Sequence, residues 1–166
     1  MSANIVFREI REAEIPQMFE LIRARIAWMD EQGMRSWNTT NYLQRYPLEY
    51  YAEEARRHQL FVLADESRGK LLSAAVLLRQ DERWSDNAPA IYIHNFVSAF
   101  GEKGAGSLFL QHTEAHARRL GLSLVRLDSI ENNAAISAYY DSRGYAAVGK
   151  CEDGPYHGVL REKRLP

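Results

Sequence analysis

The stretch FVSAFGEKGAGSLFL, residues 96–110, places three glycines between an apolar run and a segment with the pattern of a helix. The glycines are Gly101, Gly104 and Gly106, and the helix is expected from about Gly104 to Leu120. A loop that leaves a strand and enters a helix presents unpaired amides and the positive end of the helix dipole. Glycines allow a ligand to approach that backbone closely. The stretch therefore predicts either a site for an anion such as a diphosphate, or a tight turn before a helix.

Two known phosphate-binding patterns do not match this loop. The nucleoside-triphosphate loop requires G-x-x-x-x-G-K-[ST], whereas Gly106 is followed by Ser107 and Leu108. The dinucleotide fingerprint reads G-x-G-x-x-G and has an acidic residue about 20 positions later. Asp128 suits the acidic position, but the order of the glycines differs and no series of βαβ units surrounds them. A nucleotide-binding domain therefore stays a minor alternative.

The rest of the chain predicts a mixed α+β fold, because hairpins come first and one strand–helix–strand crossover follows. Hydrophobic periodicity and the positions of glycine and proline set the expected elements. The expected strands are 4–10, 59–66, 71–80, 90–98, 123–130, 145–150 and 156–165. The expected helices are 12–33, 47–57, 104–120 and 133–143, with a loop over 34–46 and a turn-rich segment over 81–89.

Composition limits the class of protein. The 166 residues suit a single domain over 1–166 with a real core. A net charge of −1 without a basic block argues against binding to nucleic acid, which depends on Lys and Arg. Cys151 is the single cysteine, so no internal disulfide forms and a reducing, cytoplasmic setting is expected. No signal peptide and no run long enough to span a membrane are evident, so we expect no membrane partner.

A second motif follows the glycine loop at a fixed separation. The segment NNAAISAYYDSRGY carries Asn133, Tyr140 two helical turns later, and the Gly144-Tyr145 pair that ends the helix. Taken with Gly101–Gly106, it resembles the GNAT superfamily of acetyl-CoA-dependent N-acetyltransferases. Members show [QR]-x-x-G-x-[GA] at a helix start, then a strand, then N-x-x-A-x-x-x-Y-x-x-x-G-[FY]. The resemblance is clearest over residues 90–149, and the upstream order of elements agrees with it.

The chain also departs from the family pattern. Gly101 stands where the family has Gln or Arg, and Ile136 stands where it has a small residue. The segment VSAFGEKG, residues 97–104, is about one residue shorter than usual and lacks the common proline. These departures keep a second hypothesis open, namely a catalytically silent acyl-CoA-binding module with a regulatory role.

The resemblance implies a GNAT-like, mostly antiparallel sheet of about seven strands with helices on both faces. It also implies that acetyl-CoA binds along a bulged strand that ends near Phe96–Ser98, with the diphosphate on the amides that follow. A backbone N–H near Phe96 or Val97 would polarise the thioester carbonyl. The implied cofactor-binding residues are Phe96, Val97, Ser98, Lys103, Gly104, Ala105, Gly106, Ser107, Asn133 and Tyr140. No metal is implied.

Tyr140 and Asn133 each have a structural and a functional interpretation. Tyr140 could pack its helix against the sheet, whereas its motif position implies a catalytic acid that protonates the leaving thiolate. Its neighbour Tyr139 has a different helical phase and is expected to be structural. Asn133 precedes a helix, where asparagine is a common N-cap, and capping is compatible with a contact to the cofactor.

The acceptor is expected to be a primary amine on a small molecule or a peptide. Trp28 and Trp37 are candidate substrate residues because they lie on the first helix and in the polar loop after it. Tyr92 and His94 alternate with Ile91 and Ile93, so they should share one face of a strand, where His94 could relay a proton. His112 and His116 are four residues apart but lack a third metal ligand. The sequence leaves the oligomeric state open, a homodimer included.

Overall fold

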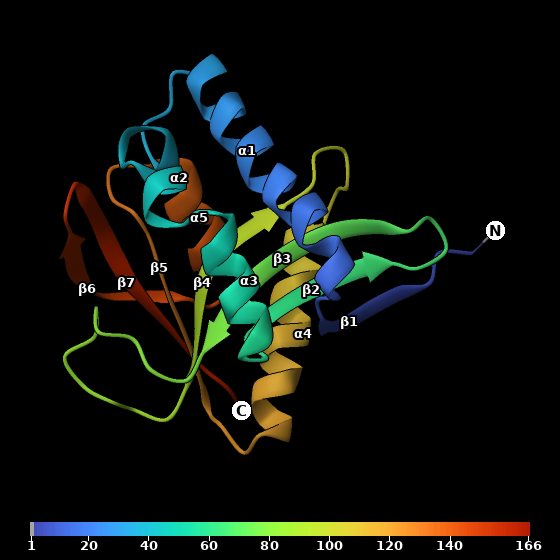
Figure 1. Cartoon of the computed structure of the whole chain (residues 1–166). Coiled ribbons are helices and arrows are strands. Elements are labelled where there is room, and N and C mark those ends of the chain that lie inside the picture. The colour runs from blue at the N-terminus through green and yellow to red at the C-terminus, as the bar shows by residue number, and fades with distance from the viewer. Residues whose placement is uncertain (1) are drawn as a thin grey trace. The chain divides into compact units, whose positions relative to one another are not determined.

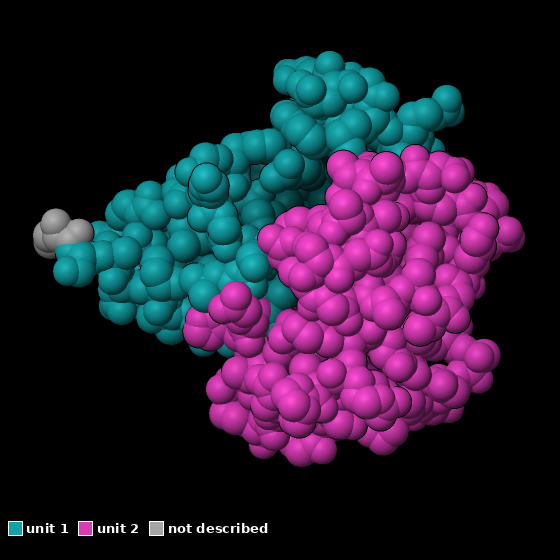
Figure 2. Space-filling view, turned by 180° about the vertical axis from the view of Figure 1, so that it is seen from behind, with its two compact units in different colours: residues 1–76, 95–110 teal, residues 77–94, 111–166 magenta. Residues whose placement is uncertain are grey.

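The computed structural model describes residues 2–166 and divides the chain into two compact units (Figure 2). Unit 1 comprises residues 1–76 and 95–110, and unit 2 comprises residues 77–94 and 111–166. The single domain expected from the sequence stays a prediction. None of the described helices is long and apolar enough to cross a membrane.

Seven strands form one sheet in the order β1-β2-β3-β4-β5-β7-β6 (Figure 1). Four of the strand pairs are antiparallel, namely β1–β2, β2–β3, β5–β7 and β6–β7, whereas β4 and β5 are parallel. The predicted mixed, mostly antiparallel α+β sheet is therefore confirmed. The strands are β1 Ile5–Glu9, β2 Leu60–Asp65, β3 Lys70–Leu78, β4 Ile91–Ser98, β5 Leu124–Ile130, β6 Ala146–Asp153 and β7 Tyr156–Arg164.

The helices agree with the prediction except near residues 34–47. That segment, expected to be a loop, contains the short helices η2 and α2. Pro47 was expected to be the first residue of the next helix, but it is the N-cap residue of α3. Tyr42 explains the difference, because its ring is buried and stacks on Trp37 with ring centroids 4.3 Å apart. The helices are η1 Glu12–Glu14, α1 Ile15–Glu31, η2 Trp37–Thr39, α2 Tyr42–Arg45, α3 Leu48–Arg56, α4 Ala105–Arg119 and α5 Ala134–Ser142.

Unit 1 packs helices on both faces of its strands. Figure 1 shows α1 and α3 in front of β2 and β3, and the first turns of α4 behind them. On the α4 side, Phe7 lies 5.4 Å from both Phe61 and Phe109, measured between ring centroids. On the other side, Phe19 of α1 contacts Tyr51 of α3 at 5.9 Å. These rings bury apolar area that holds the start of α4 against the sheet.

Strand β4 contains an irregular residue near its middle. Asn95 has φ 57°, in the left-handed region that β-strands do not use. Its side chain is held on both sides: Nδ2 donates to the Tyr42 hydroxyl at 2.6 Å, and the Tyr50 hydroxyl donates to Oδ1 at 2.8 Å. Asparagine tolerates this conformation better than most residues. The resemblance implied a bulge near Phe96–Ser98, and the irregularity stands immediately before that segment.

Unit 2 contains buried charges that are compensated within it. Arg126 is 5% exposed and pairs with Glu162 at 2.7 Å and with Asp86 at 2.5 Å. Arg161 is 2% exposed and pairs with Asp141 at 2.7 Å. A buried guanidinium is tolerated when carboxylates satisfy it. Arg126 lies on β5 and Arg161 lies on β7.

We expect replacement of Glu114 on α4 by alanine to destabilise the protein by about 2 kcal/mol. Glu114 is buried, accepts a hydrogen bond from the Tyr145 hydroxyl at 2.9 Å, and pairs with Lys163 Nζ at 2.8 Å. Alanine would leave both donors without this acceptor. Urea unfolding would measure the loss, with Glu152→Ala as the matched control. Glu152 is 76% exposed and pairs with His157, so its removal should have little effect. Equal unfolding midpoints for the two variants would contradict the prediction.

Candidate cofactor and acceptor sites

The glycine loop presents open amides at the start of α4. Gly101 and Gly104 have φ values of 77° and 81°, which other residues adopt with strain. The Ala105 N–H already donates to the Glu102 carbonyl at 3.1 Å. Among the described residues, however, no acceptor is within hydrogen-bonding distance of the Gly106 or Ser107 N–H. These two amides are therefore available to an anion at the positive end of the helix.

The backbone at Gly104 faces open space. A Cβ built on Gly104 would meet no atom within 4 Å, so a side chain there would project into open space. The backbone of the predicted residues Gly104, Gly106 and Ser107 is called the cradle below; Gly104 is exposed, and Gly106 and Ser107 are half-buried. Ala105 does not contribute its amide, and Lys103 is exposed beside the cradle. The residues present fit a diphosphate.

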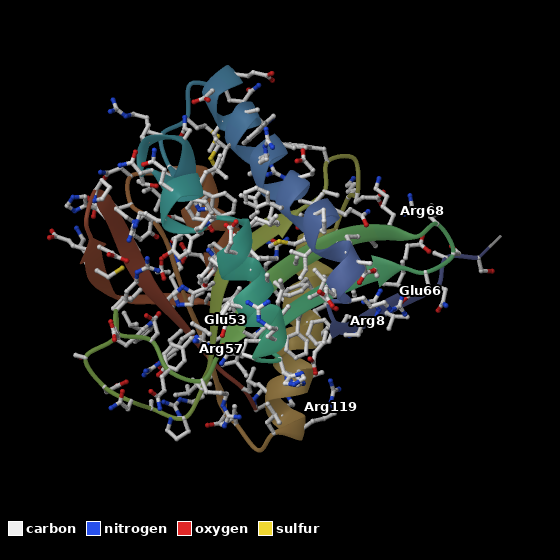
Figure 3. All side chains as sticks on the ribbon, in the orientation of Figure 1. Arg8, Glu53, Arg57, Glu66, Arg68 and Arg119 are labelled. Carbon is white, nitrogen blue, oxygen red and sulfur yellow. The ribbon has the colours of Figure 1, made fainter. Side chains whose placement is uncertain are left out.

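The acidic residue of the loop, Glu102, pairs with two cations, Arg68 of the β2–β3 turn and Lys70 at the start of β3. Arg68 donates to both carboxylate oxygens at 3.0 and 3.2 Å, and Lys70 Nζ lies 2.8 Å from Oε1. The hydrogen bond from Arg68, followed by that from Lys70, lowers the pKa of Glu102 from its usual 4.5 to about 2. Figure 3 shows Arg68 at the β2–β3 turn of unit 1. The loop is thereby anchored to the hairpin.

We expect the stability of the protein to fall as the pH drops from about 4.5 towards 2. Several unit 1 carboxylates have a pKa lowered in the folded state, so their contribution is present above the unfolded-state pKa and is lost as they are protonated. They are Glu14 and Glu66, bonded by Arg8, Asp65, bonded by Ser67 and Arg68, and Glu102. Urea midpoints at several pH values would test this, with Glu102→Gln as the comparison. An equally steep fall in that variant would exclude a contribution from Glu102.

The end of β4 is tied to β3 and to α1. The Val97 carbonyl accepts from the Ser73 hydroxyl at 3.0 Å, and that hydroxyl also lies 2.7 Å from the Ser98 Oγ. The Ser98 carbonyl accepts from Arg25 at 2.9 Å. Phe96 stacks on Phe109 of α4, with centroids 5.3 Å apart. Phe96, Val97 and Ser98 are therefore rigidly placed directly before the glycine loop, as a strand edge for a cofactor requires.

In unit 2, the second motif folds as its spacing predicts. Asn133 is the N-cap of α5, because its side chain accepts from the Ile136 N–H at 3.0 Å. The Tyr140 ring packs against Tyr139 and Tyr145 at 5.1 and 6.1 Å. No group in residues 2–166 is within hydrogen-bonding distance of the Tyr140 hydroxyl. Burial raises the pKa of this phenol above its usual 10.0, so it keeps its proton at neutral pH.

His94 belongs to a charged cluster that the sequence did not reveal. Its Nε2 lies 2.8 Å from Asp81 Oδ2, and its Nδ1 lies 3.3 Å from Arg83. Arg83 also pairs with Asp128 at 3.3 Å and with Asp153 at 2.8 Å. Ligand atoms of Asp81, His94 and Asp128 are within 4.8 Å of one another, a spacing suited to a metal ion. Arg83 contacts Asp81, His94 and Asp128, and it supplies positive charge to this cluster.

The other predicted acceptor residues have defined surroundings. The Tyr92 hydroxyl donates to the Ala88 carbonyl at 2.9 Å and accepts from Arg126 at 3.1 Å. Tyr92 and His94 both contact the segment between β3 and β4, as a shared strand face predicts. In unit 1, Trp37 stacks on Tyr42, while Trp28 lies 5.9 Å from Phe100. Tyr92 is thus a packed residue, and the two tryptophans lie in aromatic layers of unit 1.

Sequence comparison places these features in a family. The model of the "Acetyltransferase (GNAT) family" matches residues 26–145, which is well over half of the chain. That span includes the glycine loop, Asn133 and Tyr140. The chain belongs to the GNAT acetyltransferase family. It is accordingly an acyltransferase, and the family membership favours this function over the nucleotide-binding alternative.

Solved structures share the GNAT fold at low identity. A GNAT acetyltransferase from Listeria monocytogenes is 19% identical over 99% of both chains, with a TM-score of 0.79. PaiA N-acetyltransferase from Thermoplasma acidophilum, solved with coenzyme A, is 17% identical over 98% of this chain and 99% of that one, with a TM-score of 0.70. YncA from Salmonella typhimurium, solved with acetyl-CoA, is 16% identical over 98% and 95%, with a TM-score of 0.66. No functionally curated protein matches this GNAT chain.

Two groups of polar residues of this GNAT chain were missed by sequence reasoning. One is the cluster of Asp81, Arg83 and Asp128 around His94, whose members come from a turn-rich segment and two strands. No periodic pattern links them. The other is Arg25, which had a visible signal. It lies three residues after Ile22 and four before Met29, on the side of α1 that buries its apolar residues.

Proposed function

We propose that this protein transfers an acetyl group from acetyl-CoA directly to a primary amine of a small molecule or a peptide. The observation that carries the proposal is the pair of amides at Gly106 and Ser107 that have no acceptor among the described residues. The family match and the relatives solved with CoA or acetyl-CoA support it. Acetyl-CoA supplies the activated thioester from which the amine takes the acetyl group.

We expect the chain to bind acetyl-CoA mainly through main-chain groups. In this proposal the Gly106 and Ser107 amides donate to the diphosphate, and Gly104 leaves room for it. The edge of β4 at Phe96–Ser98 pairs with the pantetheine arm as an added strand would. A main-chain N–H at Phe96 or Val97 donates to the thioester oxygen as negative charge develops there. Asn133 caps α5 and keeps that helix in place.

Tyr140 is the proposed catalytic acid. Its hydroxyl has no partner in residues 2–166, and burial keeps it protonated at neutral pH. It donates its proton to the sulfur as the carbon–sulfur bond breaks, which prevents the thiolate from reversing the reaction. The raised pKa means that Tyr140 donates only as charge develops on sulfur, and does not act as an ionised group.

For the acceptor amine we propose two kinds of contact residue, aromatic and polar. Trp28 and Trp37 supply aromatic surface for the substrate, and Tyr92 and His94 define a polar strand face. Both His94 nitrogens are engaged, by Asp81 and by Arg83. In this proposal His94 therefore orders the charged cluster, and the amine proton leaves to solvent. The reaction needs no metal, the setting is cytoplasmic and a homodimer is compatible with it.

Calorimetry with acetyl-CoA, followed by an amine panel read out as free thiol, tests the proposal. Saturable binding in the micromolar range and thiol release with at least one amine are expected. Absence of binding would contradict the proposal altogether. Binding without thiol release over a broad panel would favour the silent acyl-CoA-binding module. That alternative is motivated by Gly101, which stands where the family has Gln or Arg, and by the shortened segment 97–104.

A further inference from the structure

Arg25 on α1 carries a charge that no described residue neutralises. Its NH2 donates to the Ser98 carbonyl at 2.9 Å, and its guanidinium carbon lies 4.0 Å from the centroid of Phe100 and 5.1 Å from that of Trp28. Among residues 2–166, no carboxylate is within 4.0 Å of it. Burial lowers the pKa of this guanidinium below its usual value. The group is partly removed from water without receiving a counter-charge.

Three other shielded arginines of the chain have carboxylate partners. Arg8 in unit 1 pairs with Glu14 and Glu66, each at 2.8 Å. Arg126 and Arg161 in unit 2 each have a carboxylate within 2.7 Å. Desolvating a cation is costly unless an anion compensates it. Arg25 departs from this pattern, as does Arg143 in unit 2, which bonds only to Tyr139 and Ser142 among the described residues. A guanidinium offers five donors, and the described partners of Arg25 use only one of them.

The Arg25 guanidinium lies at the junction between β4 and the glycine loop. Ser98 is the last residue of β4, and Phe100 directly precedes Gly101 of the glycine loop. The same loop leads to the open amides of Gly106 and Ser107 within unit 1. A cation without a counter-ion and two amides without acceptors therefore belong to one strand–loop–helix junction. All of these groups favour the same kind of ligand, an anion with several oxygens.

We propose that Arg25 binds a phosphate oxygen of the CoA diphosphate, so that the ligand supplies the counter-charge that no carboxylate in residues 2–166 provides. The inference rests on the proposed function and adds a side chain from α1 to a site otherwise made of backbone amides. Arginine suits this role because its fork of donors matches phosphate oxygens. The Phe100 and Trp28 rings hold the guanidinium plane in place before the ligand arrives.

The test compares Arg25→Met with Arg23→Met on the same helix. Methionine keeps the apolar contact with Phe100 but removes charge and donors. Arg23 is 59% exposed and pairs with Glu20, so it serves as a matched control. The dissociation constants for CoA, dephospho-CoA and pantetheine are measured by calorimetry, and the melting temperatures without ligand by scanning calorimetry.

In Arg25→Met we expect affinity for CoA and dephospho-CoA to fall by the same factor, about 10- to 100-fold. Pantetheine, which lacks the diphosphate, should bind both proteins equally. The melting temperature without ligand should change little, because the removal of a desolvated charge offsets the loss of the hydrogen bond to the Ser98 carbonyl. Arg25→Lys should lose less affinity than Arg25→Met, and it serves as the second variant if methionine impairs folding.

Three results would overturn the inference. One is unchanged CoA affinity in Arg25→Met. A second is a loss seen with CoA but not with dephospho-CoA, which would assign Arg25 to the 3′-phosphate. A third is a raised acceptor KM with unchanged CoA affinity, which would assign it to an acidic group of the acceptor. If the wild-type protein itself fails to bind CoA, the proposed function fails as well, so the two failures are distinguishable.

Discussion

Tyr140→Phe should lower the turnover number by about 100- to 10,000-fold while leaving the affinity for acetyl-CoA unchanged. The substitution removes a single hydroxyl. That hydroxyl bonds to nothing in the described residues, so the folded state loses no hydrogen bond with it. The contacts of the ring with Tyr139 and Tyr145 remain. The leaving sulfur would then depart without a proton donor, and steady-state kinetics with free-thiol detection would show the loss.

The control for this prediction is Tyr139→Phe. The Tyr139 ring lies 3.6 Å from the Arg143 guanidinium, a contact that the phenylalanine ring also makes. We therefore expect near-normal turnover in this variant. Melting temperatures of both variants should match the wild type. A Tyr140→Phe protein that melts much earlier, or that turns over normally, would show that the residue only packs α5 against the sheet.

Gly104→Val should weaken acetyl-CoA binding by about 100-fold or more, because it both strains the loop and fills the cradle. The backbone φ of 81° is unfavourable for a β-branched residue. The new side chain would meet no protein atom within 4 Å of its Cβ, and would therefore occupy the space in which we place the diphosphate. Calorimetric titration with acetyl-CoA would measure the change.

Strain and steric block are separated by Gly121→Val at the other end of α4. Gly121 has φ 77°, and a Cβ added there would likewise meet nothing within 4 Å, so the backbone cost of about 1–2 kcal/mol is matched. The Gly121 variant should lose stability but keep its affinity for acetyl-CoA. If both variants bind equally well, the diphosphate lies elsewhere than above Gly104.

Much of this fold was predictable because its signals are local. Alternating apolar residues specified the strands, and Gly33, Gly121 and Gly144 marked helix ends, where each has a positive φ. The motif around Asn133 and Tyr140 predicted a capped helix that the structure contains. The short helices near Trp37 were missed since they depend on aromatic stacking, which a periodic pattern does not record.

The candidate site likewise has one part that the sequence predicted and one part that it did not. The glycine loop was predictable because a strand, glycines and a helix adjoin in sequence. The partners of His94 were not, because Asp81 lies 13 residues away and Asp128 lies on another strand, so only the fold brings them together. Arg25 was detectable in principle as a charge on an apolar helix face. Its meaning required the structure, which shows that no carboxylate of the described chain meets it.

The clamp on Asn95 has a practical consequence for redesign. The side-chain amide of Asn95 is hydrogen-bonded by Tyr42 of α2 and Tyr50 of α3. The backbone conformation of β4 therefore depends on a segment about 50 positions upstream. A chimera that imported residues 37–51 from a relative to change its acceptor preference would also have to import the matching residue at 95. Without it, the graft would alter the strand segment on which we place the thioester.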